Sequence, residues 1–118
     1  MDETRVGSAP QQPGAVAPPR ALLTVVHATA EGEAGRRYPV GAEDVSLGRE
    51  EGNTIVVASD QASRRHARIT VSGGSHVLVD LDSTNGTFLN SKPAKEATLR
   101  HGDVLRIGTV VFKYVVEG

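Results

Sequence analysis

The segment "LDSTNGTFLN", residues 81–90, decides the fold class because it places a tight-turn signal directly before an apolar run. Asn85 and Gly86 both adopt positive φ readily, and an Asn-Gly pair favours the turn of a β-hairpin. Ser83 and Thr84 precede this pair, and their hydroxyls can hydrogen-bond to nearby backbone groups or to a ligand. The segment therefore predicts a β-turn whose extra polar groups either brace the loop or bind another molecule.

Outward from this turn, the chain consists of short runs of β-branched and apolar residues, separated by Gly, Asn, Asp or Ser. Within 66–71 the odd-numbered residues are apolar and the even-numbered ones are polar, which is the alternation of a half-buried strand. No stretch of ten or more residues keeps a helical period. Many short strands with turn signals between them predict an all-β sandwich or barrel. The runs span residues 22–29, 36–40, 45–48, 54–57, 66–71, 76–81, 86–89, 103–108 and 109–116.

The first 20 residues differ in composition from the rest of the chain. They hold four of the six prolines and almost no bulky apolar side chain, so they bury too little surface to offset the entropy lost on ordering. We predict a disordered Pro/Ala-rich tail over residues 1–20. Residues 21–118 are predicted to form a single domain, because that length suffices for one core.

The composition argues against several classes of binding site and function. The chain has no cysteine, so disulfides and thiolate metal sites are excluded. A net charge of −1 and only four aromatic residues argue against nucleic-acid binding. Neither a signal-peptide core nor a membrane-spanning apolar run is present, so we expect a cytoplasmic monomer without membrane contact. The histidines are scattered, so we expect no metal or other cofactor; they are His27, His66, His76 and His101.

Two basic positions stand where predicted strands meet loops. Arg49 follows the run 45–48, and Ser63 and Arg64 precede the run 66–71. Guanidinium groups offer forked charged donors and hydroxyls donate short hydrogen bonds, so this set suits a dianionic phosphate. Taken singly, Arg49 could equally be a solvated surface charge and Ser63 a loop cap. No nucleophile elbow, P-loop or dinucleotide fingerprint occurs, so we expect no enzymatic activity.

The chain from Leu22 to Glu117 resembles a forkhead-associated (FHA) domain, a phosphothreonine-peptide-binding β-sandwich. Several sequence blocks occur in the family's order and at its spacing, over about four fifths of the chain. The resemblance implies an all-β sandwich of two twisted, mainly antiparallel sheets. The blocks are "GR" at 48–49, "N" at 53, "SRRHA" at 63–67, "DLDSTNGTFLN" at 80–90, the pattern L..GD.L.IG over 99–108, and "VFKY" at 111–114.

The resemblance also implies a role for each matching residue. Arg49 and Ser63 should contact the phosphate, and Arg64 the phosphate or the peptide near it. Thr84 should line the phosphothreonine pocket, and Asn85 should hold the peptide main chain just after the phosphothreonine. FHA domains are an established example of phospho-motif recognition by arginine clusters. Three further positions should support the site structurally: Gly48, His66 and Gly86.

Three positions depart from the family's usual pattern. Ser91 stands where a Gly is common, and the small Ala62 precedes the Ser-Arg pair where a larger apolar residue is usual. Asp82 lies beside the proposed pocket, and we expect it to face solvent. Asn53 is expected to bond its own loop. The remaining arginines of the folded part near these loops are interpreted as surface charges: Arg65, Arg68, Arg100 and Arg106.

The leading functional hypothesis is a phosphothreonine-binding module in Ser/Thr kinase signalling. The alternative is a scaffold domain that binds a partner through its sheet faces regardless of phosphorylation. Thr4, which follows two acidic residues, is a candidate regulatory phosphosite: once phosphorylated, it could occupy the pocket in cis because a tether gives a high effective concentration. An inert leader is the simpler interpretation of this segment.

Overall fold

The computed structural model describes residues 16–117, which contain eleven β-strands and no helix. Each predicted run overlaps one strand, with bounds that differ by a few residues, and two short strands, β8 and β9, were not predicted. The strands are β1 (Ala21–His27), β2 (Arg37–Val40), β3 (Val45–Gly48), β4 (Ile55–Val56), β5 (Ala67–Ser72), β6 (Ser75–Asp80), β7 (Thr87–Leu89), β8 (Lys92–Pro93), β9 (Glu96–Thr98), β10 (Val104–Ile107) and β11 (Val110–Val116).

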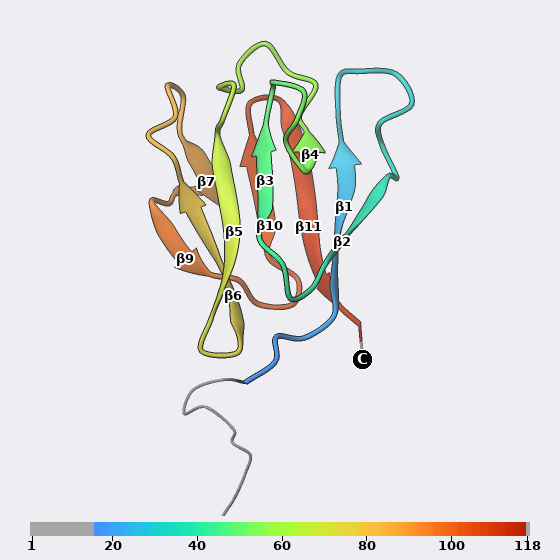
Figure 1. Cartoon of the computed structure of the whole chain (residues 1–118). Helices are drawn as coiled ribbons and strands as arrows, with labels where there is room; N and C mark the ends of the chain where they lie inside the picture. The colour runs from blue at the N-terminus through green and yellow to red at the C-terminus, as the bar shows by residue number, and fades with distance from the viewer. Residues whose placement is uncertain (1–15, 118) are drawn as a thin grey trace, which may run out of the picture.

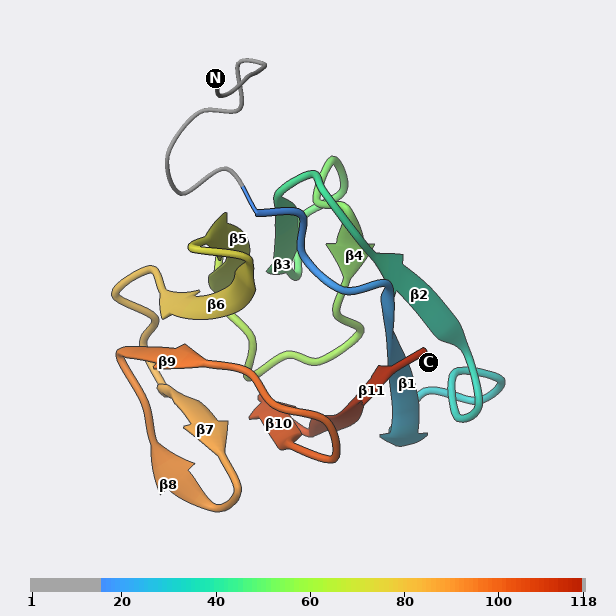
Figure 2. The same cartoon turned by 90° about the horizontal axis from the view of Figure 1, so that it is seen from below.

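The strands form two sheets that face each other as the layers of a sandwich (Figures 1 and 2). One sheet has six strands in the order β2-β1-β11-β10-β7-β8, and the other has five in the order β4-β3-β5-β6-β9. Neighbouring strands are antiparallel, except that β3 and β4 are parallel. The prediction of an all-β sandwich of two mainly antiparallel sheets is confirmed.

The core lies between the sheets and is built from alternate residues of the longer strands. In β1 the side chains of Ala21, Leu23 and Val25 are buried, while those between them are less so. On β11 the rings of Phe112 and Tyr114 are each 1 % exposed. A fully buried Leu, Ile or Phe side chain contributes about 1.5–3 kcal/mol of transfer free energy. This apolar layer is what holds the loops at the ends of the sandwich in fixed positions.

One buried polar contact joins the two sheets. The Nδ1 atom of His76 on β6 lies 2.6 Å from the hydroxyl of Tyr114 on β11, and its Nε2 lies 2.8 Å from the carbonyl oxygen of Gly41. Because a carbonyl only accepts, Nε2 carries the proton, and Nδ1 accepts from the tyrosine hydroxyl. Burial, with a smaller effect from the Asp103 carboxylate, raises the pKa of Tyr114. The hydroxyl therefore stays protonated, as this contact requires.

The strands that were not predicted are short, polar edge strands. β8 and β9 have two and three residues, and most of their residues are exposed. The turn that joins β7 to β8 has positive φ at both central residues, 51° at Asn90 and 72° at Ser91. Such a turn matches the twist of a hairpin. Asn tolerates this backbone region well, but Ser is strained there.

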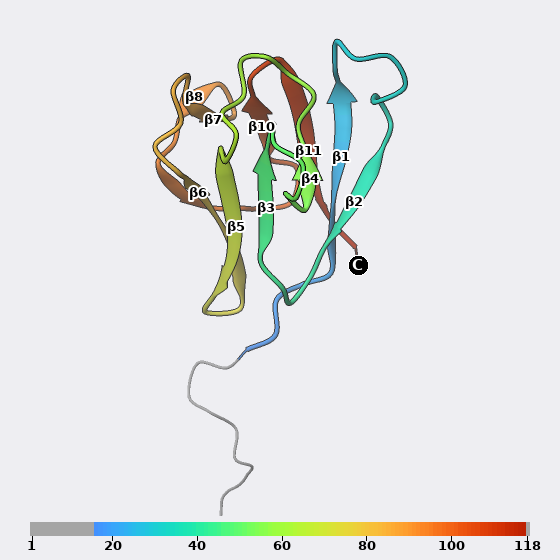
Figure 3. The ribbon, with the colours of Figure 1, turned by 45° about the horizontal axis from the view of Figure 1, so that its top comes forward.

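The β3–β4, β4–β5 and β6–β7 loops lie at one end of the sandwich, opposite the end from which residues 16–20 enter (Figures 1 and 3). Residues 16–20 have no regular secondary structure, and the side chain of Val16 lies against Gly74 in the β5–β6 turn. The remainder of the predicted tail, with Thr4, lies outside the described residues. None of the described segments forms a helix long and apolar enough to cross a membrane.

Candidate functional site

Three loops meet at the end of the sandwich opposite residues 16–20: the β3–β4, β4–β5 and β6–β7 loops. Hydrogen bonds join these loops to one another. The backbone N–H of Arg49, just after β3, donates to the carbonyl oxygen of Ser63 over 2.9 Å. The backbone N–H of Thr84, in the β6–β7 loop, donates to the Ser63 hydroxyl oxygen over 3.1 Å. The fold thus brings together Arg49, Ser63 and Thr84, which are up to 35 positions apart in the chain.

The side chain of Arg49 is exposed but oriented. Its Nε–H donates to the carbonyl oxygen of Ala62 over 3.0 Å, and this bond fixes the plane of the guanidinium. The Nη groups form no ion pair with an acid among residues 16–117. Ala62 is itself 3 % exposed, so this small residue still anchors the loop. Arg49 therefore presents a charged fork at the surface.

Ser63 has its hydroxyl oxygen engaged and its hydroxyl hydrogen available. The oxygen accepts from the Thr84 N–H, while the backbone N–H of Ser63 donates to Nδ1 of His66 over 3.0 Å. A serine hydroxyl that accepts one bond still has an O–H to donate. A phosphate oxygen at the open end of the loops would be a suitable acceptor.

The side chain of Arg64 is exposed, whereas its backbone is held by two donors. Its carbonyl oxygen accepts from the backbone N–H of Glu50 over 3.2 Å and from Nδ2 of Asn53 over 2.9 Å. Asn53 also donates to the carbonyl oxygen of Glu50 over 2.6 Å. Asn53 therefore bonds its own loop, as expected, and in addition joins that loop to the β4–β5 loop.

Gly48 and Gly86 are glycines for two different reasons: close packing at Gly48 and a positive φ at Gly86. A Cβ atom at Gly48 would overlap the carbonyl oxygen of Arg64 and would lie 2.9 Å from Nδ2 of Asn53. Only glycine allows the loops to approach this closely. Gly86 has φ +87°, a left-handed conformation that favours glycine.

His66 links the β4–β5 and β6–β7 loops from inside the protein. Its side chain is 0 % exposed, although the alternation over residues 66–71 groups it with the polar residues of that run. Nδ1 accepts from Ser63 N–H, so Nε2 carries the proton and donates to the carbonyl oxygen of Gly86 over 3.0 Å. His66 is thus a strut between two loops and has no surface for a ligand.

Asp80, the last residue of β6, accepts the hydrogen bonds that hold the β6–β7 loop. Oδ1 accepts from the hydroxyls of Ser83 and Thr87 over 2.5 and 2.7 Å, and Oδ2 accepts from the Ser83 N–H over 3.1 Å. Burial opposes the charged carboxylate, but these hydrogen bonds and the positive charge of Lys95 outweigh burial and lower the pKa of Asp80. Ser83 in turn accepts from the Gly86 N–H over 3.0 Å. Ser83 is therefore a brace of the loop.

Thr84 and Asn85 are the exposed part of the same loop. The Nδ2 group of Asn85 donates to the carbonyl oxygen of Gln61 over 2.8 Å, which orients the amide across the β4–β5 loop. Its Oδ1 atom and second N–H remain on the exposed side. Asp82 is exposed with φ 55°, as the solvent-facing prediction requires. The loop both braces itself and presents an oriented amide.

The FHA domain model matches residues 45–108, which include Arg49, the Ser63-Arg64 pair and the Thr84-Asn85 pair. The chain belongs to the FHA domain family. It is 37 % identical over 75 residues to the glycogen accumulation regulator GarA of Mycolicibacterium smegmatis, an alignment that covers 64 % of this chain and 48 % of that protein. To the oxoglutarate dehydrogenase inhibitor of Corynebacterium glutamicum it is 32 % identical over 108 residues, or 90 % of this chain and 73 % of that protein.

Solved FHA structures share the fold. Mycobacterium tuberculosis EmbR in complex with a low-affinity phosphopeptide has a TM-score of 0.74 and 32 % identity, with 85 % of this chain and 25 % of that chain covered. A structure from a study of phosphothreonine-dependent FHA domain interactions has a TM-score of 0.73 and 29 % identity, with 84 % and 98 % covered. The chain spans about half the length of several curated relatives that it matches.

The residues that brace the loops of this FHA domain have little sequence signal. The sequence left Ser83 open between bracing and binding and did not single out Asp80, and Gln61 acts through a backbone carbonyl that carries no sequence signal. The spacing Asp80-x-x-Ser83 ahead of a turn is the Asx-type pattern that could have indicated a brace. Residues 16–117 contain no group of three or more His, Cys, Asp or Glu side chains placed to hold a metal ion.

Proposed function

We propose that this FHA domain binds phosphothreonine-containing segments of partner proteins in Ser/Thr kinase signalling, as a non-catalytic cytoplasmic monomer without nucleic-acid or membrane contact. The observation that supports it is the bonding of the Arg49, Ser63 and Thr84 loops into one exposed surface. Related FHA domains have been solved with phosphopeptides, which supports the same ligand class here. We further propose residues 21–118 as the folded domain.

Each proposed contact follows from the available donors. Arg49 and Arg64 supply charge to a phosphate that carries nearly two negative charges, and Ser63 donates its O–H. Thr84 lines the pocket, and the Asn85 amide accepts from and donates to the peptide main chain. A hydrogen bond to a charged group contributes about 1.5–3 kcal/mol, so loss of one arginine should weaken binding at least about tenfold.

Titration calorimetry with a phosphothreonine peptide chosen from a degenerate library, and with its unphosphorylated form, tests this proposal. Arg49→Ala, Ser63→Ala and Arg64→Ala should each weaken binding of the phosphorylated peptide. Arg68→Ala, which removes an exposed arginine on β5, is the matched control and should not. Equal binding of the phosphorylated and unphosphorylated peptides would instead support the scaffold alternative.

Thr4 is retained as a proposed regulatory phosphosite, because a phosphothreonine on the same chain would be a ligand for the site at high effective concentration. After kinase treatment, the chain should bind the phosphothreonine peptide more weakly, and Thr4→Ala should abolish this effect. Mass spectrometry that finds Thr4 unmodified after treatment would contradict the proposal.

A further inference from the structure

A groove lies on the side of the sandwich where β8 and β9 end the two sheets. Figure 2 shows these strands together, on the side opposite β2 and β4. The groove has a volume of about 600 Å³. Its lining includes four apolar residues, Leu89, Pro93, Ala94 and Ala97. The polar residues of the lining are Asn90, two lysines, Lys92 and Lys95, and one acid, Glu96.

The groove continues to the binding loops. A smaller cavity of about 100 Å³ shares Pro93, Ala94 and Lys95 with it and reaches Gly86 and Thr87. Gly86 directly follows Asn85, the residue proposed to hold the peptide main chain after the phosphothreonine. Through these three shared residues the linings of the two cavities adjoin, and together they give a path from Gly86, next to the proposed binding site, to Ala97.

We propose that this path binds the part of the same partner protein that follows the residues held by Asn85, and that it selects an extended segment of alternating apolar and acidic residues. The inference rests on the proposed function. An extended chain advances about 3.3 Å per residue, so an added segment of about eight residues reaches on the order of 26 Å beyond its point of attachment.

The charge and the sheet edges determine which segment fits. Lys92 and Lys95 outnumber Glu96 in the lining, and Lys95 is 82 % exposed, with its Nζ 3.7 Å from a carboxylate oxygen of Asp80. Only the lysine of this pair is exposed, since the Asp80 side chain is 2 % exposed. The separation of 3.7 Å is long for a charged hydrogen bond, so the Lys95 ammonium can also face a partner carboxylate. β8 and β9 are the outer strands of their sheets, and an extended segment can lie along a sheet edge.

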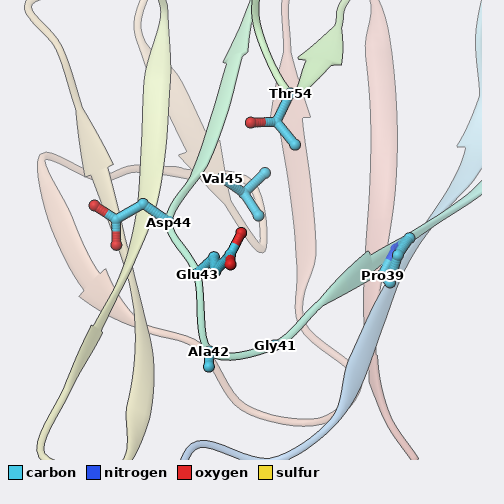
Figure 4. A pocket seen from close by; sticks show the side chains of 7 residues that line it. All are labelled: Pro39, Gly41, Ala42, Glu43, Asp44, Val45 and Thr54. Atoms are coloured by element: carbon cyan, nitrogen blue, oxygen red, sulfur yellow. The ribbon is translucent and has the colours of Figure 1, made fainter.

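A groove on the opposite side of the sandwich has acids and no basic residue in its lining. This groove of about 270 Å³ is lined by Pro39, Val45 and Thr54, with Glu43 and Asp44 beside them (Figure 4). This second groove shares no lining residue with the cavity that reaches Gly86. An acidic partner segment that leaves Asn85 is therefore expected on the β8–β9 side.

Calorimetry on the full chain with three phosphopeptides tests the inference. The first ends shortly after a phosphothreonine in a context chosen from a degenerate library. The second adds about eight residues that alternate Leu and Asp, and the third adds the same length of alternating Leu and Lys. The Leu-Asp peptide should bind about tenfold more tightly than the short one, and the Leu-Lys peptide clearly less tightly than the Leu-Asp peptide.

Variants of the groove should weaken the long peptide more than the short one. Lys92→Gln with Lys95→Gln should weaken Leu-Asp binding about threefold or more relative to the short peptide, whose affinity reports any effect of losing the Lys95–Asp80 ion pair in the binding loop. Arg37→Gln with Lys113→Gln removes the same charge from two exposed positions of the six-stranded sheet and is the matched control. Ala94→Glu should block the junction of the two cavities and so weaken binding of the long peptide. The melting temperature of this variant is measured together with its affinity.

The outcomes separate the two proposals. If the short and the Leu-Asp phosphopeptides bind with the same Kd, the groove inference is overturned while the proposed function stands. If the control pair weakens Leu-Asp binding as much as the groove pair, the groove inference is likewise overturned. If no phosphopeptide binds, the proposed function fails, and the inference fails with it.

Discussion

The stability of the β6–β7 loop should depend on the carboxylate of Asp80. The substitution Asp80→Asn tests this through the free energy of unfolding. The carboxylate accepts three hydrogen bonds, two at Oδ1 and one at Oδ2. An asparagine that keeps its oxygen at the Oδ1 position turns its NH₂ toward the N–H of Ser83, so two donors face each other. One charged hydrogen bond of about 1.5–3 kcal/mol is lost and two weaken. We expect a loss of about 2–4 kcal/mol in the free energy of unfolding.

The pH dependence follows from the lowered pKa of Asp80. Burial acts to raise this pKa, but the hydrogen bonds from Ser83 and Thr87 and the charge of Lys95 reverse the direction. A carboxyl whose folded pKa is depressed adds stability that is fully present above its unfolded value, 3.8 for Asp80, and is lost as the pH falls through the folded value. The stability gap between wild type and Asp80→Asn should therefore be largest near neutral pH and narrow in acid.

Urea denaturation across a pH series measures this gap, with Asp82→Asn as the control. Asp82 is a carboxylate of the same loop but is exposed, so its replacement should change the free energy of unfolding by less than about 0.5 kcal/mol. Equal effects of the two substitutions at neutral pH would refute the reasoning. So would a gap for Asp80→Asn that stays constant down to the acid limit of folding.

Three further substitutions test the scaffold. Ser91→Gly should raise the free energy of unfolding in urea by about 0.5–1 kcal/mol, because φ at this position is 72° and glycine removes the strain; an unchanged or lower stability would contradict this. Tyr114→Phe should cost about 1–3 kcal/mol by urea denaturation, because the buried Nδ1 of His76 loses its donor. Gly48→Ala should cost about 3 kcal/mol or more, because the new Cβ overlaps the carbonyl of Arg64; a melting temperature equal to that of the wild type would show that the loops do not pack this closely.

The strand pattern was largely predictable from the sequence because burial on one face leaves an alternating pattern. Every predicted run overlaps one strand of the structure. β8 and β9 left no such pattern, since they are edge strands of two and three mostly exposed residues, and their pairing is decided by the turn at Asn90 and Ser91. The order of strands in the sheets depends on contacts between distant residues, which no local pattern records.

The sequence suggested the kind of candidate site but not its construction. Residue chemistry suggested phosphate as the ligand of Arg49, Ser63 and their neighbours, and only the resemblance to FHA domains predicted that Arg49, Ser63 and Thr84 lie together. His66 shows why the contacts that hold the loops could not be predicted from the sequence. The alternation in 66–71 put it on the face opposite the buried Ala67, yet it is 0 % exposed, because β5 begins only at Ala67 and His66 turns between two loops.

The construction separates two kinds of residue, and this separation is itself testable. His66 is a buried strut whose loss leaves the Ser63 N–H and the Gly86 carbonyl without partners, so His66→Ala should lower both the free energy of unfolding, by about 2–4 kcal/mol, and the affinity for a phosphothreonine peptide. Arg64 has an exposed side chain, so Arg64→Ala should lower the affinity and change the stability by less than about 0.5 kcal/mol. Calorimetry below the melting temperature of each variant, with urea denaturation beside it, measures both quantities. If Arg64→Ala destabilised the fold as much as His66→Ala, the arginine would be part of the scaffold, and its assignment to the phosphate would lose its physical basis.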